Sequence, residues 1–414
     1  MKNNPPQTIS GFSSLGIAPA LLETLTRLRF IIPTPIQQQV IPVAIQGKDI
    51  VGIAQTGTGK TLAFGIPMIQ RLTQTQKKGL VMLPTRELAI QVDEVLRRTG
   101  KNLGLKTVVL IGGTAIGPQI RAIKQNPTII IATPGRLLDH LKQQTLRLDS
   151  VSIAVLDEAD RMLDMGFARE IEKILRTVPK NRQTMLFSAT MPPAIMKLAT
   201  AHMKLPIRIE IAPSGSLPER VTQEIFIIQK NVKNRLLEKV LERYPDTTLI
   251  FTRTKYTAGR LTRTIRAMGH NAAEIHSGRS LSQRREALEG FKSGKYRVLV
   301  ATDIASRGIQ VVGIGLVLNY DVPTNPGDYV HRIGRTARAG AGGHAISFIT
   351  PEQRSELRNI ERLIRKNLPI SKLPELPPES SPLEQASRHL PPTRRPHDHS
   401  RRERRPFVHR RRSR

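Results

Sequence analysis

The segment Ala54-Gln55-Thr56-Gly57-Thr58-Gly59-Lys60-Thr61 has the residue types and spacing of a loop that binds phosphate. Its glycines allow the backbone to bend until several N–H groups point at one anion. Lys60 can supply a charge for the β- and γ-phosphates of a nucleotide, and the Thr61 hydroxyl can ligate Mg²⁺. An apolar run precedes the loop and a helical pattern follows it, which favours a nucleotide site over a simple Gly/Thr-rich turn.

A second candidate site is acidic and follows the apolar run Ile153–Leu156. Ligands of open α/β sheets bind at the carboxyl ends of the strands, so Asp157 can reach a metal ion held beside Lys60 and Thr61. Glu158 is then placed to orient or deprotonate an attacking water. The alternative is a solvated acidic N-cap of a helix. The phosphate loop in the same chain favours the catalytic interpretation.

The elements that must position these residues are short apolar runs alternating with helical patterns, which predicts parallel sheets covered on both faces by helices. The runs expected to be strands in the first half are Ile50–Ala54, Leu80–Leu83, Val108–Ile111, Ile129–Ala132, Ile153–Leu156 and Met185–Phe187. Those in the second half are Ile225–Ile228, Leu249–Phe251, Ala272–Ile275, Val298–Ala301, Leu316–Leu318 and Ala345–Ile349.

A Pro/Gly/Ser-rich break at 211–218 separates the two halves and has the composition of a linker. Since the order and length of the elements match on both sides, we expect one α/β architecture used twice. The expected boundaries are a first domain at 1–210, a linker at 211–221, a second domain at 222–367 and a disordered Arg-rich tail at 368–414.

The charge of the chain indicates a polyanionic partner, because Lys and Arg outnumber Asp and Glu by 65 to 33 over 414 residues. The tail from Ser381 carries 11 Arg and three acidic residues, so most of the formal +32 lies outside it. Aromatic residues are only 4%, so contacts with a nucleic-acid backbone should dominate over base stacking. No segment suits a membrane span or signal peptide, and cysteine is absent, which fits the cytoplasm.

The motifs in this order resemble those of the DEAD-box ATP-dependent RNA helicases, a family named for the tetrad that stands here at Asp157–Asp160. The resemblance covers roughly residues 10 to 365. It implies two tandem RecA-like domains, ATP and Mg²⁺ as cofactors, and RNA as the partner, unwound or remodelled locally. The short basic tail is similar to that of the bacterial RhlE-like branch and makes ribonucleoproteins candidate partners.

The resemblance assigns roles to further residues of the first half. Gln37 corresponds to the glutamine that reads adenine, with Phe12 and Phe30 as its aromatic companions, and Arg29 stands where the family usually has Gly. Asp160, Ser188, Thr190 and the distant His331 correspond to residues that couple the ATP state to strand separation. The residues of the first half that it assigns to the RNA backbone are Pro84, Thr85, Arg86, Gly112, Gly113, Thr133, Pro134, Gly135 and Arg136.

In the second half the resemblance assigns Arg335 and Arg338 to the γ-phosphate of ATP, which they would approach when the domains close. Asp303 is assigned to the nucleotide as well. The corresponding residues for RNA are Arg253, Thr302, Arg307 and Gly308.

Two positions depart from the family pattern. Gln310 stands where an Asp usually accepts a hydrogen bond from the ATP ribose, and Leu281 stands where a Gln usually precedes Arg284 by three residues. Aligning Gln283 there instead would put Glu286 at the arginine position, so the departure at Leu281 is real. The hypothesis is that closure on ATP is weaker in this chain, while RNA binding is retained.

Two other functions stay open on the sequence. The first is an RNA clamp with poor turnover, which the departures at Gln310 and Leu281 suggest. The second is a DNA helicase or translocase on the same scaffold, which is disfavoured because the glutamine motif and the acidic tetrad together resemble the RNA branch.

Overall fold

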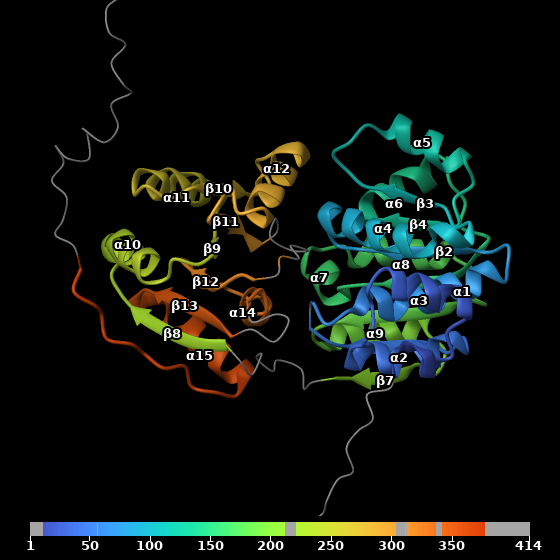
Figure 1. Ribbon diagram of the computed structural model, residues 1–414, viewed down its shortest axis with the longest axis horizontal. Coiled ribbons are helices and arrows are strands. Elements are labelled where there is room, and N and C mark those ends of the chain that lie inside the picture. Colours follow the sequence, from blue (N-terminus) through green and yellow to red (C-terminus); the bar gives the residue numbers. More distant parts are fainter. Residues whose placement is uncertain are drawn as a thin grey trace, which may run out of the picture.

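The computed structural model describes residues 11–55, 57–211, 221–303, 311, 313–336 and 342–376. They form two α/β domains that lie side by side (Figure 1). Each has one sheet, and every pair of neighbouring strands in both sheets is parallel. The expected fold class is therefore confirmed for the described residues.

The first sheet has seven strands in the order β3-β4-β2-β5-β6-β1-β7. Its strands are β1 (Ile50–Ile53), β2 (Lys78–Met82), β3 (Thr107–Leu110), β4 (Ile129–Ala132), β5 (Val151–Leu156), β6 (Gln183–Ser188) and β7 (Ile207–Glu210). The helices of this domain are α1 (Pro19–Arg27), α2 (Pro35–Ile45), α3 (Lys60–Thr73), α4 (Arg86–Gly100), α5 (Ile116–Lys124), α6 (Pro134–Lys142), α7 (Ala159–Asp164), α8 (Ala168–Thr177) and α9 (Pro193–His202).

The second sheet has six strands in the order β10-β11-β9-β12-β13-β8. Its strands are β8 (Val221–Ile227), β9 (Thr248–Thr252), β10 (Ala272–Ile275), β11 (Val298–Thr302), β12 (Leu316–Asn319) and β13 (Gly343–Ile349). The helices are α10 (Lys233–Arg243), α11 (Lys255–Ala267), α12 (Leu281–Lys292), α14 (Pro326–Ile333) and α15 (Arg354–Ile364). The described residues also form short 3₁₀ helices at Phe12–Leu15, Lys101–Leu103, Lys230–Val232 and Pro351–Gln353.

Both faces of each sheet are buried, which explains the continuous apolar runs in the sequence. In β2, Leu80 and Met82 pack into the core on one face, whereas Val81 and the following Leu83 pack into the core on the other. All strands expected from the sequence are present, with ends that differ by a few residues. The additional strand is β7, an edge strand in which Ile209 alone is buried.

Ordered contacts continue beyond residue 367, where the sequence analysis placed the end of the second domain. Leu368 is buried, and Ile370 pairs in parallel with Ile225 in β8, the edge strand of the second sheet. Leu368 and Leu376 pack against apolar clusters of the domain, and the backbone around Ile370 hydrogen-bonds to Ile225. The rest of the expected tail, from 377, and most of the expected linker lie outside the described residues.

Candidate active site and RNA interface

The phosphate loop lies between the carboxyl end of β1 and the first turn of α3, as the sequence predicted. Gly57 and Gly59 have φ angles of 89° and 92°, in the left-handed region that favours glycine. A Cβ at position 59 would also collide with the side chain of Gln37. Thr56 lies outside the described residues. Glycine is thus required at Gly59 both by its backbone and by its neighbour.

Lys60 points back across the loop toward the acidic tetrad. Its Nζ donates to the carbonyl oxygen of Ala54 at 3.0 Å and lies 3.9 Å from Oδ1 of Asp157. Both side chains are almost fully buried, at 6% and 4% exposure. Because a buried cation attracts anions strongly, the arrangement suits a phosphate held between the loop backbone and Lys60. Thr61, the next residue, is half-buried.

Gln37 joins the segment before α2 to the phosphate loop. Its Oε1 accepts from the backbone N–H of Thr34 at 2.9 Å, and its Nε2 donates to the carbonyl of Gly59 at 3.0 Å. The first bond belongs to a capping box that starts α2. Since an amide side chain has two hydrogens and two lone pairs on oxygen, one of each remains for a ligand.

Asp157 and Glu158 lie at the carboxyl end of β5, beside the phosphate loop. Burial raises the pKa of Asp157 to about 6, although Lys60 and the backbone N–H of Glu158 oppose the rise. Glu158 has φ 52° and ψ 49°, a left-handed conformation that costs roughly 1–3 kcal/mol in a non-glycine residue. Such strain is common at active sites, where the surrounding structure holds a reactive side chain in place.

Asp160 connects the tetrad to the segment after β6. Its Oδ2 accepts from the backbone N–H groups of Ala189 and Thr190 and from the Thr190 hydroxyl, at 3.1, 3.0 and 2.9 Å. Ser188 is fully buried at the end of β6. The structure thus brings together Asp160 and Thr190, two residues that the sequence assigned to coupling.

The second domain meets the tetrad through the end of α14. Nε2 of His331 lies 3.8 Å from Oδ2 of Asp160, so the third coupling residue joins the same group. Arg332, Arg335, Asp328 and Asp303 line a narrow cavity together with His331 and with Arg161 of the first domain. Arg335 is buried, with 2% of its surface exposed. This cavity lies between the domains and is rich in arginine.

Arg161 and Arg332 are two site residues to which the sequence analysis gave no individual role. Arg161 lies 3.5 Å from Oε2 of Glu158 and is 2% exposed. Arg332 binds Asp303 with both ends of its guanidinium, at 2.6 and 2.7 Å. Asp303, which the resemblance assigns to the nucleotide, is thus paired with Arg332 in this structure. The available signal was an arginine inside or beside a motif. The partner of Arg161 is three residues away, whereas that of Arg332 is distant in sequence.

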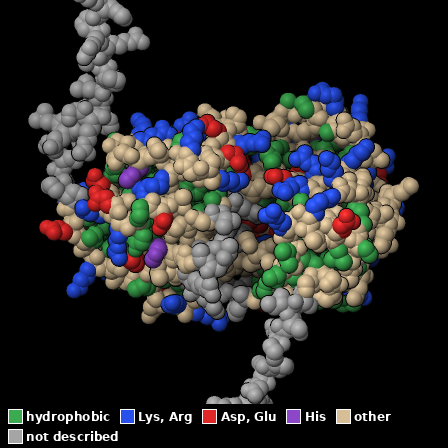
Figure 2. Space-filling model, viewed as in Figure 1, with side chains coloured by type: hydrophobic (Ala, Val, Ile, Leu, Met, Phe, Trp, Pro, Cys, Tyr) green, Lys and Arg blue, Asp and Glu red, His purple; other side chains and the backbone are tan. Residues whose placement is uncertain are grey.

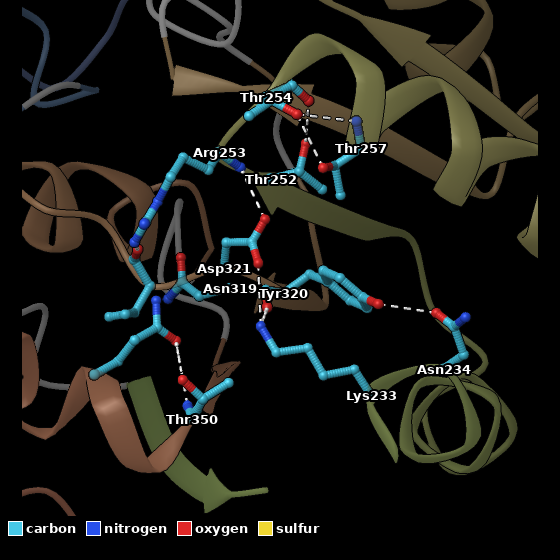
Figure 3. A network of polar contacts seen from close by, with 12 residues as sticks. Lys233, Asn234, Thr252, Arg253, Thr254, Thr257, Asn319, Tyr320, Asp321 and Thr350 are labelled. Carbon is cyan, nitrogen blue, oxygen red and sulfur yellow. Dashed lines mark hydrogen bonds and ion pairs between the residues drawn. The ribbon is translucent and has the colours of Figure 1, made fainter. Parts of the chain in front are cut away.

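A polar network positions the carboxyl ends of β9 and β12 (Figure 3). Asp321 accepts from Nζ of Lys233 at 3.1 Å and from the backbone N–H of Arg253 at 3.0 Å. Its backbone carbonyl accepts from Arg332, and that of Tyr320 accepts from Lys233. Arg253, assigned to RNA, is exposed and donates to the carbonyl of Val322, whereas Thr302 is buried at the end of β11.

The residues assigned to RNA in the first domain gather where β2, β3 and β4 end. Arg86 lies against Gly112 and Gly113, and a Cβ at Gly113 would collide with its guanidinium. Thr85 caps α4 by accepting from the N–H of Leu88, and α6 begins at Pro134 after Thr133. Two helix N-termini and free guanidinium hydrogens thus face one edge, which suits phosphate oxygens.

Arg136 and Arg284 add positive charge near Arg86. Arg136 donates twice to the carbonyl of Thr114, at 3.1 Å each. Burial is the main cause that lowers the pKa of Arg86, and the charges of Arg284 and Arg136 lower it further. Arg284 reaches across the domain boundary to Glu87, with 2.9 Å between Nη2 and Oε1. This charge cluster is therefore shared by the two domains.

Leu281 lies at the first position of α12 and packs against the core of the first domain. Its neighbour Gln283 is used in the capping box of α12, where its Oε1 accepts from the N–H of Ser280 at 3.0 Å. The position that usually carries a polar glutamine thus makes an apolar contact between domains.

Several assigned residues are not placed at the site. Phe12 is 5% exposed and packs in the core of the first domain. Phe30 lines a cavity of about 310 Å³ with residues of α4 and with Lys292 of α12, and the lining does not include Gln37. The assigned residues outside the described part are Thr56, Arg307, Gly308, Gln310 and Arg338.

The chain matches two family profiles, DEAD/DEAH box helicase over residues 34–198 and Helicase conserved C-terminal domain over residues 232–340. It is 43% identical over 368 residues to the DEAD-box ATP-dependent RNA helicase CshA of Bacillus subtilis, covering 88% of this chain and 74% of that protein. CshA of Limosilactobacillus reuteri is 42% identical over 370 residues, covering 89% and 74%.

Solved structures give the same result. Dbp5 of S. cerevisiae bound to RNA and ADP BeF3 superposes with a TM-score of 0.79 at 29% identity, covering 88% of this chain and 95% of that one. Mss116p bound to ssRNA and AMP-PNP superposes with a TM-score of 0.82 at 28% identity, covering 91% and 82%. Both matches span the two domains.

Two tandem RecA-like domains with a phosphate loop and an acidic tetrad define an ATP-dependent helicase. The chain belongs to the DEAD-box family of ATP-dependent RNA helicases. ATP is its nucleotide and RNA its polymer partner, as the sequence predicted. Within the described residues, no helix combines the length and apolar character needed to cross a membrane.

Proposed function

We propose that the chain hydrolyses ATP when RNA bridges its two domains and that it separates or remodels short RNA structures locally. The observation that carries the proposal is the meeting of Asp160, Thr190 and His331, which links the tetrad, the segment after β6 and the second domain at one carboxylate. We propose functional domains at 1–210 and 222–367, with the second extended to Leu376 by its packing.

Lys60, Thr61 and Asp157 have the chemistry needed to hold ATP with Mg²⁺. The loop glycines leave a cradle that a Cβ at Gly59 would fill, and Lys60 lies buried at its base. Asp157 and Thr61 would supply two oxygen ligands to the ion. That suits Mg²⁺, which commonly takes one or two protein ligands beside phosphate and water oxygens. When bound, the ion would neutralise charge on the phosphates.

Glu158 is the proposed base or orienting group for the attacking water. Its left-handed backbone at the end of β5 sets the direction in which its carboxylate leaves the strand. Gln37 is proposed to read adenine with its remaining amide hydrogen and lone pair. We also propose that Arg335 and Arg338 stabilise the γ-phosphate, since Arg335 lies buried at the interdomain cavity. Arg307, Gly308 and Gln310 keep the roles that the resemblance assigns.

RNA is proposed to lie across the edge formed by Arg86, Gly113 and Arg136 and to continue to Arg253 of the second domain. Donors along this edge are backbone N–H groups and guanidinium hydrogens, which suit a sugar-phosphate chain read without regard to sequence. Because RNA is made and used in the cytoplasm of bacteria, the source of the curated relatives, we also propose a cytoplasmic location.

An RNA clamp with slow turnover is the second candidate function, and Leu281 is the observation that favours it. An apolar contact between domains stabilises the closed arrangement whether or not ATP has been hydrolysed, which is the opposite of the weaker closure expected from the sequence at this position. A helicase that reopens slowly would hold RNA for longer per ATP.

Strand separation tests the proposal. We expect a short RNA duplex with a single-stranded overhang to be separated in the presence of ATP, and an equivalent DNA duplex to be separated poorly. Tight RNA binding without separation would support the clamp. Equal activity on RNA and DNA would contradict the proposal and favour a translocase of broader specificity.

A further inference from the structure

The outer face of α11 is uniformly basic. Lys255, Arg260, Arg263 and Arg266 are all exposed, and α11 contains neither Asp nor Glu. Every other described α-helix of the second domain contains at least one acidic residue. The charge of α11 is therefore a local property of this helix and not only a sample of the basic composition.

The cations of α11 are also available to an external anion. On the neighbouring α10, Lys239 pairs with Glu242 at 2.9 Å and Arg243 lies 4.0 Å from Glu224. By contrast, none of the four cations of α11 forms an ion pair with another described residue. Arg263 and Arg266 donate to the backbone carbonyls of Gly259 and Ala272, at 3.4 and 2.8 Å, which leaves their charge uncompensated. Without acidic partners, the side chains of α11 repel one another, and a polyanion would relieve that repulsion.

Tyr256, the second residue of α11, supplies a ring that can stack. It is 78% exposed, whereas the other four tyrosines are buried or half-buried. Nζ of Lys255 lies 5.2 Å from the centre of the ring and covers one of its faces. An exposed ring beside a cation is a suitable platform for a nucleobase, since every base has a face that stacks.

Helix α11 begins close to Arg253, the residue at which the proposed RNA path reaches the second domain. Its first residues follow β9 directly, after Arg253, which the Asp321 network holds in place (Figure 3). Tyr256, Arg260 and Arg263 are spaced by four and three residues, so they lie along one side of the helix. Figure 2 shows Lys and Arg side chains gathered over the part of the second domain where Figure 1 places α11.

We propose that α11 is an auxiliary site for single-stranded RNA that extends beyond the strand held between the domains. Tyr256 stacks on a base, and Arg260 and Arg263 contact the phosphates that follow. The combination of an exposed ring with cations that have no acidic partner fits an unpaired strand better than a duplex, whose bases are already stacked. The inference rests on the proposed RNA binding of the core and adds a second, length-dependent contact to it.

The test compares affinities for a series of oligouridylates, short ones that fill only the core and longer ones that extend past it. Tyr256→Ala should weaken binding of the long RNA about tenfold relative to the short RNA, whereas Tyr256→Phe keeps the ring and the affinity. Arg260→Gln with Arg263→Gln should reduce the salt dependence for the long RNA by about 1.4 in log–log slope.

A matched control is the pair Arg358→Gln with Arg362→Gln, two exposed arginines on α15, which packs on α14 and not on the strands beside α11. These changes should leave the ratio of long to short affinities as it is. An unchanged ratio in the α11 variants would overturn the proposal. A larger loss for blunt duplex than for single strands would overturn the assignment to unpaired RNA. Absent binding of both lengths by the natural chain would instead contradict the core RNA site.

Discussion

Six non-glycine residues of the described chain have a positive φ angle, and two of them, Glu158 and Arg29, adopt it in very different settings. Glu158, with φ 52°, is strained at the acidic tetrad, where its proposed role requires a carboxylate and so excludes glycine. Arg29, with φ 61°, ends the turn after α1, where the family usually has glycine. The side chain of Arg29 is exposed, so its backbone strain is not offset by burial.

Arg29→Gly should therefore raise the free energy of unfolding by about 1 kcal/mol, because glycine adopts positive φ without a Cβ clash. Urea unfolding followed by circular dichroism measures the change. Arg27→Gly is the matched control: Arg27 is exposed at the end of α1, and glycine there should lower stability by up to about 1 kcal/mol. A lower midpoint for Arg29→Gly would contradict the account.

We expect Asp157 to make ATP hydrolysis depend on pH. Burial raises its pKa to about 6, and both metal ligation and pairing with Lys60 need the ionised form. We expect kcat/KM for ATP to decrease as the pH drops through about 6, with the pH dependence of a single group that takes up one proton. A flat profile between about pH 5 and 8 would contradict a metal role for Asp157.

The same shift affects stability with a defined sign. An unfolded aspartate titrates near 4, so between about pH 4 and 6 the folded chain holds a proton that the unfolded chain releases. The contribution of Asp157 to stability therefore rises as the pH falls through this window and is least favourable above it. Asp157→Asn should be inactive yet more stable than the natural chain at neutral pH.

At the scale of elements, α4 and α12 form a direct bridge between the domains. Arg284 and Glu87 meet at 2.9 Å with side chains only 10% and 8% exposed, and Leu281 packs beside them on the first domain. The bridge lies close to Arg86, because the charges of both Arg284 and Glu87 affect its pKa. The contact between domains is therefore adjacent to the edge at which RNA is proposed to bind. A partly buried ion pair with an apolar neighbour is sensitive to the loss of either partner.

A double-mutant cycle of Glu87→Gln and Arg284→Gln should show a coupling of about 1–3 kcal/mol in the free energy of domain closure. Closure can be followed by energy transfer between one dye in each domain, because the chain has no cysteine and accepts introduced ones. Leu281→Ala should shift the equilibrium further toward separated domains. If the effects of Glu87→Gln and Arg284→Gln on closure simply add in the double variant, the ion pair does not contribute to closure.

The sequence predicted the strands well because both faces of each sheet are buried, and their apolar runs are continuous, as in Ile129–Ala132. It missed β7, since an edge strand with only Ile209 buried has no such run. The phosphate loop and tetrad were predicted because their residues are contiguous. The pairs Arg332–Asp303 and Arg284–Glu87 join distant segments, and one sequence holds no signal for such contacts.

At the scale of the whole molecule, positive charge extends beyond the folded domains. The chain carries a formal charge of +32, and 11 arginines follow Ser381. The segment up to Leu376 packs on the second domain, so the basic tail is attached to the chain at that domain. We expect a polycation attached at this point to increase the local concentration of RNA near the folded domains.

Removal of residues 377–414 should weaken RNA binding and lower its salt dependence, because fewer counterions are released from the RNA. The measurement is the affinity for one RNA across a range of salt concentrations, with and without the tail. ATP hydrolysis at saturating RNA should change little, since the described site lies before Leu376. An unchanged salt slope would show that the tail does not contact RNA.

The most direct test of the central claim is steady-state ATP hydrolysis with and without single-stranded RNA, for the natural chain and for Glu158→Gln. The account predicts slow hydrolysis by the natural chain alone, strong stimulation by RNA, and no stimulation in Glu158→Gln, which keeps its affinity for RNA. Hydrolysis by the natural chain at the same rate with and without RNA would contradict the claim that RNA closes the two domains on ATP.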